Sequence, residues 1–462
     1  MRSGLHRLGP SAWPRASLSA QSAWLGLLAL CASACSWSRF DDVTSNAPIV
    51  LLDKPGSMKQ GFGVSLATAK NADQVEVLVG GGIGVSGAAL YEIGTGESPS
   101  TTSIDTGYCT GSTAPCYLSS SLAGFPAATG PDHTRPLCFA VGAGTVTGQG
   151  IIFRCQDASE YDVDIPADAK AALEFAINMA QPDDFPLAAD HTDTPSLLAS
   201  SPTARAAWFY PAQSIDFSEL KAPKGVPTDD DSFGKTLAVL SVGDGRVYAV
   251  GVPNKNEVLL WKSDGSAASS YIGCLGGTPG FGRALTSGKV NRDDAADLVV
   301  SDNVDVDVID GQALFDLPET SSTDCGFASL PPGALIDSFG CGSNHSFSGC
   351  ADSEFGAALA VGDLDGDGDG EVIVGAPSMT VRGQSSAGVL LVYDAENSSD
   401  SSFEDAKFIS SADQGDQLGR SVTTASIDGR DIIVAGAPGG GKAAIFYCSA
   451  LLPPGAAGSR CP

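Results

Sequence analysis

The residues with the clearest capacity for chemistry form one short acidic segment. Carboxylates stand at every second position of this segment, and they are Asp363, Asp365, Asp367, Asp369 and Glu371. Gly368, the sixth residue, provides the backbone freedom that a sharp turn requires. Alternate side chains of a tightly curled loop point inward together, where they repel one another unless a cation is bound. Because Ca²⁺ takes about six to eight oxygen ligands, we predict a calcium site here.

The predicted ligands are the side chains at the first, third and fifth positions, the backbone carbonyl of Asp369, the side chain of Glu371, and water. We expect the ion to stabilise the loop and to have no catalytic role. The alternative is a solvated acidic turn without metal, because runs of charge are often plain surface.

A second segment has the same layout with fewer carboxylates. Aligned on Asp297 as its ninth position, it places Lys289 first, Asn291 third and Asp293 fifth. Asn291, Asp293 and Asp297 could each supply an oxygen ligand, but the Lys289 ammonium group competes with a bound cation. Metal binding by this segment therefore stays open. The corresponding connections of two other units shrink to "SVGDGR" and "SIDGR", which predict Asp-Gly hairpin turns.

A repeated pattern of apolar segments surrounds these loops. From Phe355 the chain reads "FGAALAVGDL", the acidic loop, "EVIVGAP" and then "GVLLVYD". The same order returns from Phe62, Phe233, Phe281 and Leu418. Each unit predicts a strand, a tight connection, a second strand that ends in a small-residue turn, and a third strand. The pattern blurs over 117–216, where "LCFAVGAG" with "GIIFRC" and "SLLASSP" with "AAWFYPA" indicate two more units, and where 167–181 has the apolar spacing of a helix.

Seven such units predict an all-β fold, a seven-bladed β-propeller with four antiparallel strands per blade. Continuous apolar runs such as "VIVGAP" indicate strands that are buried on both faces. The segment "AKFISS" at 406–411 is an expected outer strand. The last unit lacks one, so we expect the strand at 48–53, "PIVLLD", to pair with it and to close the ring.

These units resemble FG-GAP repeats, the propeller repeats of integrin α subunits and of many bacterial surface proteins. The resemblance rests on Phe355-Gly356 with Gly375-Ala376-Pro377, on Leu418-Gly419 with Gly436-Ala437-Pro438, and on Phe233-Gly234 with Gly251-Val252-Pro253. It implies a seven-bladed propeller, calcium in the loops between the first and second strands of some blades, and a role in adhesion or ligand binding. Glu371 departs from the family pattern, which has Asp at the ninth position.

Several motifs that would indicate catalysis are incomplete. The segment "GAPGGGKA" at 436–443 nearly matches a phosphate-binding loop, but Ala443 replaces the Ser or Thr that would hold Mg²⁺, and a strand is expected to follow. No HExxH motif or nucleophile elbow is present. Carboxylates are plentiful, and the sequence selects no acid pair for glycoside cleavage.

The N-terminal segment resembles a bacterial lipoprotein signal. Three arginines and no acidic residue precede the apolar run "AWLGLLALCASAC", which ends at Cys35. We expect a signal peptide at 1–34, lipidation of Cys35 and a tether over 35–47, with the propeller at 48–462; ordinary cleavage beside Cys35 is the alternative. Ser36 after the cysteine indicates sorting to the outer membrane, and its periplasmic or outer face is left open.

The net charge limits the possible partners, and the cysteine content indicates disulfides. The net charge of −28 would become −31 once the three arginines of 1–34 are removed, and such a chain repels nucleic acid and anionic lipid. Ten cysteines would remain beyond Cys35, and an exported chain favours disulfides. Sequential pairing gives Cys109–Cys116, Cys138–Cys155, Cys274–Cys325, Cys341–Cys350 and Cys448–Cys461, although the sequence does not fix this connectivity.

The combined features predict a monomeric, non-enzymatic, calcium-stabilised propeller that is held at a bacterial envelope by its lipid and binds a protein or a glycan. A hydrolase or lyase that acts on polysaccharide is the main alternative, and a purely structural envelope component is a third. Clustered acids and aromatics in a central funnel would favour the enzyme, and an exposed apolar or aromatic patch on one rim would favour binding.

Overall fold

The structure of this chain is a computed structural model. It describes residues 38–39, 49–52, 54, 61–70, 75–81, 88–93, 100–104, 116–126, 137–145, 148–155, 186–190, 192, 196–202, 205–210, 218–302, 304–322, 325, 330–341, 352–364, 366–393, 407–410, 413–427 and 430–446. The predicted signal at 1–34 with Cys35, the predicted helix at 167–181 and Asp365 lie outside these residues.

The described strands form seven sheets, numbered here in chain order. The first three sheets each pair sequential strands in antiparallel fashion. Sheet 1 contains β3 (Ser65–Lys70), β4 (Val75–Gly80), β5 (Ala88–Ile93) and β6 (Ser100–Ile104); sheet 2 contains β7 (Cys116–Pro126), β8 (Leu137–Thr145) and β9 (Gly148–Cys155); sheet 3 contains β10 (Leu187–Ala189), β11 (Leu197–Ser201), β12 (Ala206–Tyr210) and β13 (Ser218–Glu219).

Sheets 4 to 7 follow the same antiparallel order, and the N-terminal strands join the last two. Sheet 4 contains β14 (Leu237–Val242), β15 (Gly245–Val252), β16 (Glu257–Ser263) and β17 (Ser270–Gly276); sheet 5 contains β18 (Ala284–Gly288), β19 (Asp297–Ser301), β20 (Asp305–Ile309) and β21 (Leu335–Gly340), with helix α3 (Gly311–Phe315) between the last two; sheet 6 contains β22 (Ala358–Gly362), β23 (Glu371–Ala376), β24 (Val389–Tyr393) and β25 (Lys407–Ser410); sheet 7 contains β26 (Ser421–Ile427), β27 (Arg430–Ala437) and β28 (Lys442–Phe446).

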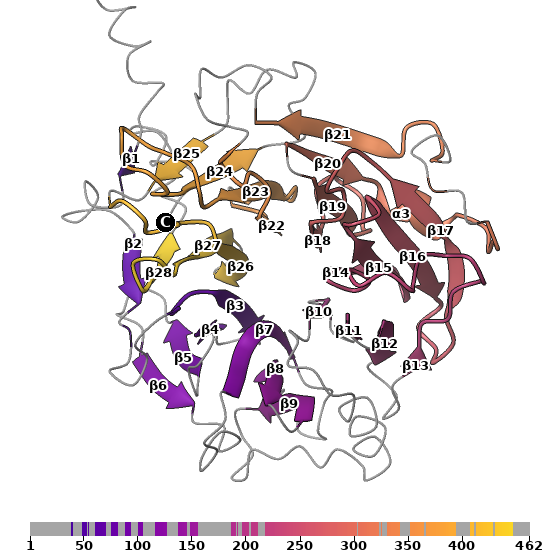
Figure 1. The fold of residues 1–462 in the computed structure, drawn as a ribbon, viewed down its shortest axis with the longest axis horizontal. Coiled ribbons are helices and arrows are strands. Elements are labelled where there is room, and N and C mark those ends of the chain that lie inside the picture. The colour runs from indigo at the N-terminus through magenta and orange to yellow at the C-terminus, as the bar shows by residue number, and fades with distance from the viewer. Residues whose placement is uncertain are drawn as a thin grey trace, which may run out of the picture.

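The sheets stand around a common centre, with the first strand of each sheet innermost (Figure 1). Each first strand contacts the first strand of the next sheet, from β3 through β7, β10, β14, β18 and β22 to β26, and β26 contacts β3. The strand β2 (Ile49–Leu52) pairs antiparallel with β28, which is the pairing that the sequence predicts for 48–53. The two-residue strand β1 (Ser38–Arg39) pairs in parallel with β25, a contact that the sequence does not predict.

The core consists of apolar strands that are covered on both faces. Every residue of β15, β11 and β19 is buried, which explains why these segments lack apolar and polar alternation. The phenylalanines that open the repeats, Phe62, Phe233, Phe281 and Phe355, are at most 1% exposed. The prediction of an all-β fold with several four-stranded antiparallel sheets is confirmed. In the part of the chain that the structure describes, no helix has the length and apolar character needed to cross a membrane.

The two halves of each repeat motif meet through a backbone hydrogen bond. The amide of Gly234 donates to the carbonyl of Gly251 at 3.0 Å, and that of Gly419 donates to the carbonyl of Gly436 at 3.0 Å. Gly234 and Gly419 have φ of 78° and 88°, a left-handed conformation that strains any other residue. A Cβ on Gly436 would strike the carbonyl of Gly63 in sheet 1, so the motif glycines also allow neighbouring sheets to approach closely.

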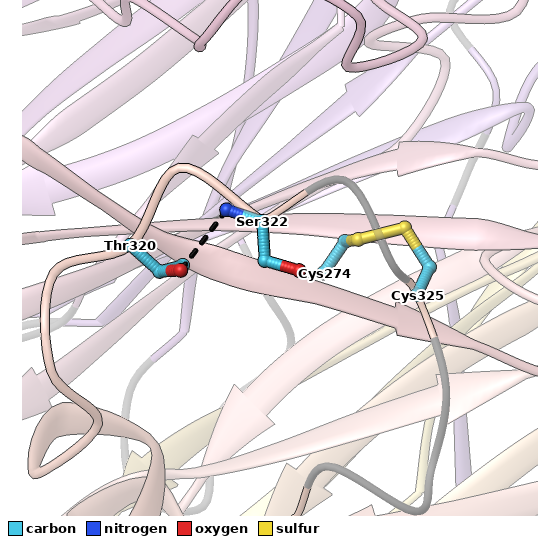
Figure 2. Close-up of a disulfide and its surroundings, with 4 residues drawn as sticks. All are labelled: Cys274, Thr320, Ser322 and Cys325. Carbon is cyan, nitrogen blue, oxygen red and sulfur yellow. Dashed lines mark hydrogen bonds between the residues drawn. A yellow bond between two sulfur atoms is a disulfide. The ribbon is translucent and has the colours of Figure 1, made fainter.

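One predicted disulfide lies wholly within the described residues. Cys274 on β17 is bonded to Cys325, 51 residues later, and Figure 2 shows the segment around Thr320 lying along that strand. Cys341 is also in a disulfide, but its predicted partner Cys350 lies outside the described residues. Cys138 and Cys155 are backbone partners in the register of β8 and β9, and their predicted bond stays a prediction, as do those of Cys109 and Cys448.

The short connections also follow the sequence. Val242 pairs with Gly245, and Ile427 pairs with Arg430, so both predicted hairpin turns have two-residue loops. The segment "GAPGGGKA" connects β27 to β28, and Lys442 begins a strand where a phosphate-binding loop requires a helix. The interpretation of this segment as a hairpin is therefore confirmed.

Candidate metal centre

The acidic loop extends the hairpin between the first two strands of sheet 6. Gly362, the last residue of β22, pairs with Glu371, the first residue of β23, so residues 363–370 project beyond the end of this strand pair. Asp363 and Glu371 are therefore held close together by the sheet, and the remaining carboxylates lie between them in the sequence. Strand pairing thus supplies the fixed frame on which the loop curls.

Asp363 organises the loop through its carboxylate. Its Oδ1 accepts hydrogen bonds from the amides of Gly366 at 2.6 Å and Asp367 at 3.1 Å, and its Oδ2 accepts from the amide of Gly368 at 3.1 Å. Gly366 and Gly368 have φ of 80° and 100°, so glycine is required at both turns. Three amides thus converge on the first carboxylate, as expected for a tightly curled loop.

Glu371 closes the loop at its other end. Its Oε2 accepts a hydrogen bond from the amide of Leu364 at 2.7 Å, and Leu364 is buried. The extra methylene of Glu371 relative to Asp therefore does not prevent its carboxylate from reaching back to the start of the loop. Within the loop, Oδ1 of Asp367 accepts a hydrogen bond from the amide of Asp369 at 3.1 Å.

Asp369 is buried and faces the neighbouring sheet. Its residue is 5% exposed, and its Oδ2 accepts a hydrogen bond from Nε of Arg292 at 2.8 Å. The other oxygen, Oδ1, has no hydrogen-bond partner among the described residues. Nη2 of Arg292 also lies 3.9 Å from Oδ2 of Asp367. The sequence predicts only the carbonyl of Asp369 as a ligand, so this arginine contact is an addition to the site.

The donor set of this loop fits a hard cation. Five carboxylates occupy 363–371, and among the described residues Arg292 lies against those of Asp367 and Asp369, so the negative charge of the loop exceeds the one positive charge of this arginine. The buried Oδ1 of Asp369 is a further oxygen whose lone pairs are available. The described side chains, to which Asp365 does not belong, include no group of three or more His, Cys, Asp or Glu residues placed to hold a metal. The calcium site therefore stays a prediction.

The loop of sheet 5 uses its predicted ligands to hold its own backbone. Oδ1 of Asn291 accepts from the amide of Asp293 at 3.0 Å, and Oδ1 of Asp293 accepts from the amide of Ala295 at 2.8 Å. Nζ of Lys289 lies 3.3 Å from Oδ1 of Asp294. These contacts give each of these predicted ligands a structural role without metal, and metal binding here stays open.

Asp297 is the most deeply buried of these carboxylates. It is inaccessible to solvent, and it accepts from the amides of Val290 at 3.0 Å, Asn291 at 3.3 Å and Gly311 at 3.0 Å. Burial raises the pKa of Asp297 to about 6, although the three amides act in the opposite direction. Asp297 therefore anchors both its loop and the start of helix α3.

Backbone hydrogen bonds set the loops of neighbouring sheets side by side. The amide of Gly370 donates to the carbonyl of Lys289 at 2.7 Å, and the amide of Asp431 donates to the carbonyl of Asp363 at 2.7 Å. Oδ2 of Asp431 also accepts from the amide of Asp363 at 3.0 Å. Sequence reasoning missed both Arg292 and Asp431, because their partners lie 77 and 68 residues away and only the repeat alignment could bring them together.

A buried ion pair marks the corresponding loop of sheet 3. Asp190 directly follows β10, as Asp363 follows β22, and its Oδ2 pairs with Nε of Arg246 on sheet 4. Both side chains are at most 4% exposed. Thr192 bridges them, since its Oγ1 donates to Oδ1 of Asp190 at 3.1 Å and accepts from Nη2 of Arg246 at 2.9 Å. Sequence reasoning missed this pair as well.

A cavity of about 210 Å³ lies among the first strands, at the centre of the sheets. Its lining consists of apolar, glycine and hydroxyl residues from sheets 1, 2, 3, 4, 5 and 7. These residues are Leu66, Ala67, Thr68, Leu122, Ala123, Gly124, Leu187, Ala188, Ala189, Leu237, Ala238, Val239, Leu285, Thr286, Ser287, Val422 and Thr423. None of these lining residues belongs to the loops at 289–296 and 363–370.

Hydroxyl groups at one position of the first strands join neighbouring sheets. Thr68 donates to the carbonyl of Thr424 at 2.6 Å, and Thr424 in turn donates to the carbonyl of Val361 at 2.7 Å. Ser287 donates to the carbonyl of Val239 at 2.7 Å. Thr68, Thr424 and Ser287 are each the fourth residue of their strand, so the same bond forms between sheets 1 and 7, 7 and 6, and 5 and 4.

Residues 355–393, which comprise β22, the whole acidic loop, β23 and β24, match the FG-GAP repeat. No curated protein matches the chain.

Proposed function

From the FG-GAP repeat that the chain contains, we propose that it is a seven-bladed β-propeller that binds Ca²⁺ and acts as a non-enzymatic binding module on a bacterial cell envelope. The observation that carries this proposal is the acidic loop at 363–371, because it lies inside the matched repeat and curls around Asp363. Carboxylates that are held by backbone amides support a structural role. The ligand of the module would be a protein or a glycan bound by loops on one face.

Two features support a closed ring of seven blades. The first strands contact one another in sequence, and the contact of β26 with β3 joins the last sheet to the first. Gly436 packs against the carbonyl of Gly63 in the same way that Gly375 packs against the carbonyl of Gly419. The interface between sheets 7 and 1 therefore repeats the interface between sheets 6 and 7, and a closed ring leaves only short, protected edges.

The predicted ligands of Ca²⁺ are Asp363, Asp365, Asp367, Glu371 and the carbonyl of Asp369. A bound ion would supply the positive charge that this loop lacks. The carboxylates of Asp363 and Glu371 already fix the ends of the loop through hydrogen bonds to amides, so the ion would add to an existing frame. Its expected effect is on stability and on the order of the loop.

Thermal unfolding tests the calcium proposal. An ion that binds only the native state adds about 2.7 kcal/mol at a concentration 100 times its dissociation constant, so Ca²⁺ should raise the Tm. Asp365→Ala should remove most of the increase, and Asp229→Ala, which removes an exposed carboxylate elsewhere, should leave it intact. Identical melting curves in Ca²⁺ and in chelator would falsify the calcium proposal.

The binding role requires a search for the ligand. A pull-down from envelope extracts and a glycan array, both with the full chain in Ca²⁺, should retain a specific protein or glycan. Release of new reducing ends from a panel of polysaccharides would instead support the hydrolase or lyase and would contradict the non-enzymatic role.

Anchoring at the envelope depends on Cys35, which we propose to be acylated. Cells that express the chain and are fed an alkyne fatty acid should label it, and Cys35→Ser should abolish the label. Label on the Cys35→Ser variant, or none on the wild-type chain, would contradict this part of the proposal.

A further inference from the structure

The acidic loop of sheet 6 is contacted by a cation from the neighbouring sheet. Arg292 lies in the loop between β18 and β19 of sheet 5, and its Nε donates to Oδ2 of Asp369 at 2.8 Å. Its Nη2 is 3.9 Å from Oδ2 of Asp367. The Arg292 side chain is 64% exposed, whereas that of Asp369 is only 7% exposed. An exposed arginine of one sheet thus reaches a buried carboxylate of the next.

The backbone fixes this contact. The amide of Gly370, directly after Asp369, donates to the carbonyl of Lys289 at 2.7 Å, and Lys289 is three residues before Arg292. The two loops are therefore held against each other next to the ion pair. A Cβ on Gly370 would also strike the carbonyl of Lys289, so a glycine at this position allows the two loops to approach closely.

Side-chain cations also pair with carboxylates in two other loops between first and second strands. Asp190, the residue after the first strand of sheet 3, pairs with Arg246 of sheet 4. Lys289, the residue after the first strand of sheet 5, pairs with Asp294 of its own loop. Three loops between first and second strands thus have a positively charged side chain against a carboxylate. In the loop of sheet 6, Arg292 lies against the carboxylates of Asp369 and Asp367.

We propose that Arg292 neutralises part of the charge of the sheet 6 loop in the metal-free protein and holds this loop against sheet 5. Arg292 would then compete with Ca²⁺ for the carboxylates of the loop. This inference rests on the proposed calcium function. A guanidinium beside the site repels a divalent ion, so it lowers the affinity of the loop for Ca²⁺. The Arg292 side chain is mostly exposed, so the pair stabilises the metal-free protein modestly, and Arg292 can withdraw when a bound ion takes over the neutralisation of the buried Asp369 carboxylate.

The test is calorimetric titration of the purified full chain with Ca²⁺. Arg292→Gln removes the charge and should raise the affinity about tenfold relative to wild type. Arg292→Lys keeps the charge and should stay within about twofold of wild type. Arg283→Gln is the matched control, because Arg283 also belongs to sheet 5 and lies 3.4 Å from a sheet 6 carboxylate, that of Glu354, but it precedes β18 instead of following it. It should leave the affinity unchanged.

Melting curves in chelator give a second measurement that does not need the metal. Arg292→Gln should lower the metal-free Tm and should show a larger gain in Tm on addition of Ca²⁺ than wild type. Circular dichroism identifies any variant that fails to fold. If Arg292→Gln fails to fold, the comparison of the Ca²⁺ affinities of Arg292→Lys and Arg283→Gln still separates the effect of the charge at position 292 from that of losing any arginine.

The outcomes distinguish this inference from the proposed function. Tighter binding by Arg292→Gln alone supports the inference. Binding by Arg292→Gln with none by wild type supports it too, and shows that the arginine has replaced the metal, which would overturn the calcium function of the native chain. Equal affinities would overturn the inference and leave the calcium function intact. Absence of binding by every variant at millimolar Ca²⁺ would overturn both.

Discussion

Glu371 and Asp297 occupy equivalent places in consecutive sheets, where each is the first residue of the second strand and each accepts a hydrogen bond from the second residue of its loop. The distances are 2.7 Å from the amide of Leu364 to Glu371 and 3.0 Å from the amide of Val290 to Asp297. One loop is rich in carboxylates and the other begins with a lysine, yet the closing bond is the same. This position therefore closes the loop whether or not metal binds.

Substitutions at Glu371 separate its two roles. Glu371→Gln keeps an oxygen that can accept from Leu364, so the free energy of unfolding in chelator should change by less than about 0.5 kcal/mol. Glu371→Ala leaves that amide without its acceptor and should lower the free energy by about 1–2 kcal/mol. Urea unfolding in chelator measures both. Equal losses for the two variants would show that the Leu364 bond has no part in the effect.

The glycine after each repeat-opening aromatic is predicted to be irreplaceable for two reasons. Gly356 has φ of 77°, and a Cβ there would lie 2.6 Å from Cβ of Ser301 in sheet 5. Gly383 has φ of 86° but open space around it, so a substitution there measures the cost of the backbone strain without a steric clash. We expect Gly383→Ala to cost about 1–2 kcal/mol and Gly356→Ala to cost about 1–3 kcal/mol more. Similar losses in urea unfolding would mean that the interface between sheets 5 and 6 tolerates the added methyl group.

Gly63 tests the proposed closure of the ring. Its φ is 88°, a Cβ there would lie 2.6 Å from the carbonyl of Lys442, and its own carbonyl accepts from Oγ of Ser421 at 2.7 Å. Lys442 and Ser421 belong to sheet 7. Gly63→Ala should therefore destabilise the chain as strongly as Gly356→Ala and should increase hydrogen exchange in β3 and β26 together. Exchange confined to sheet 1 would contradict a closed ring.

The disulfide between Cys274 and Cys325 should stabilise the fold mainly through the unfolded chain. It closes a loop with a sequence separation of 51, and Cys274 is 4% exposed. Replacement of both cysteines by alanine should lower the free energy of unfolding by about 2–4 kcal/mol. Urea unfolding without reductant measures the loss. A double variant as stable as wild type would mean that the contacts of Thr320 with β17 already hold this segment.

Local patterns account for the part of the fold that the sequence predicts. A Phe-Gly or Leu-Gly pair with a left-handed glycine opens sheets 1, 4, 5, 6 and 7, and the apolar runs after each pair predict the first three strands of these sheets. Sheet 2 lacks these signals in its first strand, β7, whose register shifts between Leu118 and Leu122, and this strand was not predicted. The parallel pairing of β1 with β25 has no local signature either, because it joins segments from opposite ends of the chain.

The candidate site divides in the same way. The position of the acidic loop at the end of a hairpin follows from the apolar segments on both sides, and the glycines at 366 and 368 follow from the turns. The contacts of Arg292 with Asp369 and of Asp431 with Asp363 depend on which residue the neighbouring sheet places opposite the loop. To predict such contacts, one must know how two neighbouring sheets are positioned relative to each other. The apolar periodicity within one repeat carries no information about this position.

The carboxylates of β20 make the stability of sheet 5 sensitive to pH. Burial raises the pKa of Asp307 above its ordinary value, and the charges of Asp302 and Asp305 add to this effect, while a hydrogen bond with Ser338 acts against it. Because the folded state then binds the proton more tightly than the unfolded state, this group stabilises the fold below the ordinary pKa of Asp, about 3.9, and the stabilisation is lost as the pH rises through the folded pKa.

Asp307→Asn should therefore be more stable than wild type at pH 7, and the difference should shrink as the pH falls toward 4. Asn keeps an oxygen and an amide for the bond with Ser338, so the packing is preserved. Asp264→Asn is the control of opposite sign, because hydrogen bonds from Ser266 lower the pKa of Asp264 and removal of that charge should not stabilise the chain at pH 7. Thermal unfolding in chelator from pH 4 to pH 7 gives the comparison. A constant difference between Asp307→Asn and wild type over this range would show that the Asp307 carboxyl titrates alike in the folded and unfolded chain.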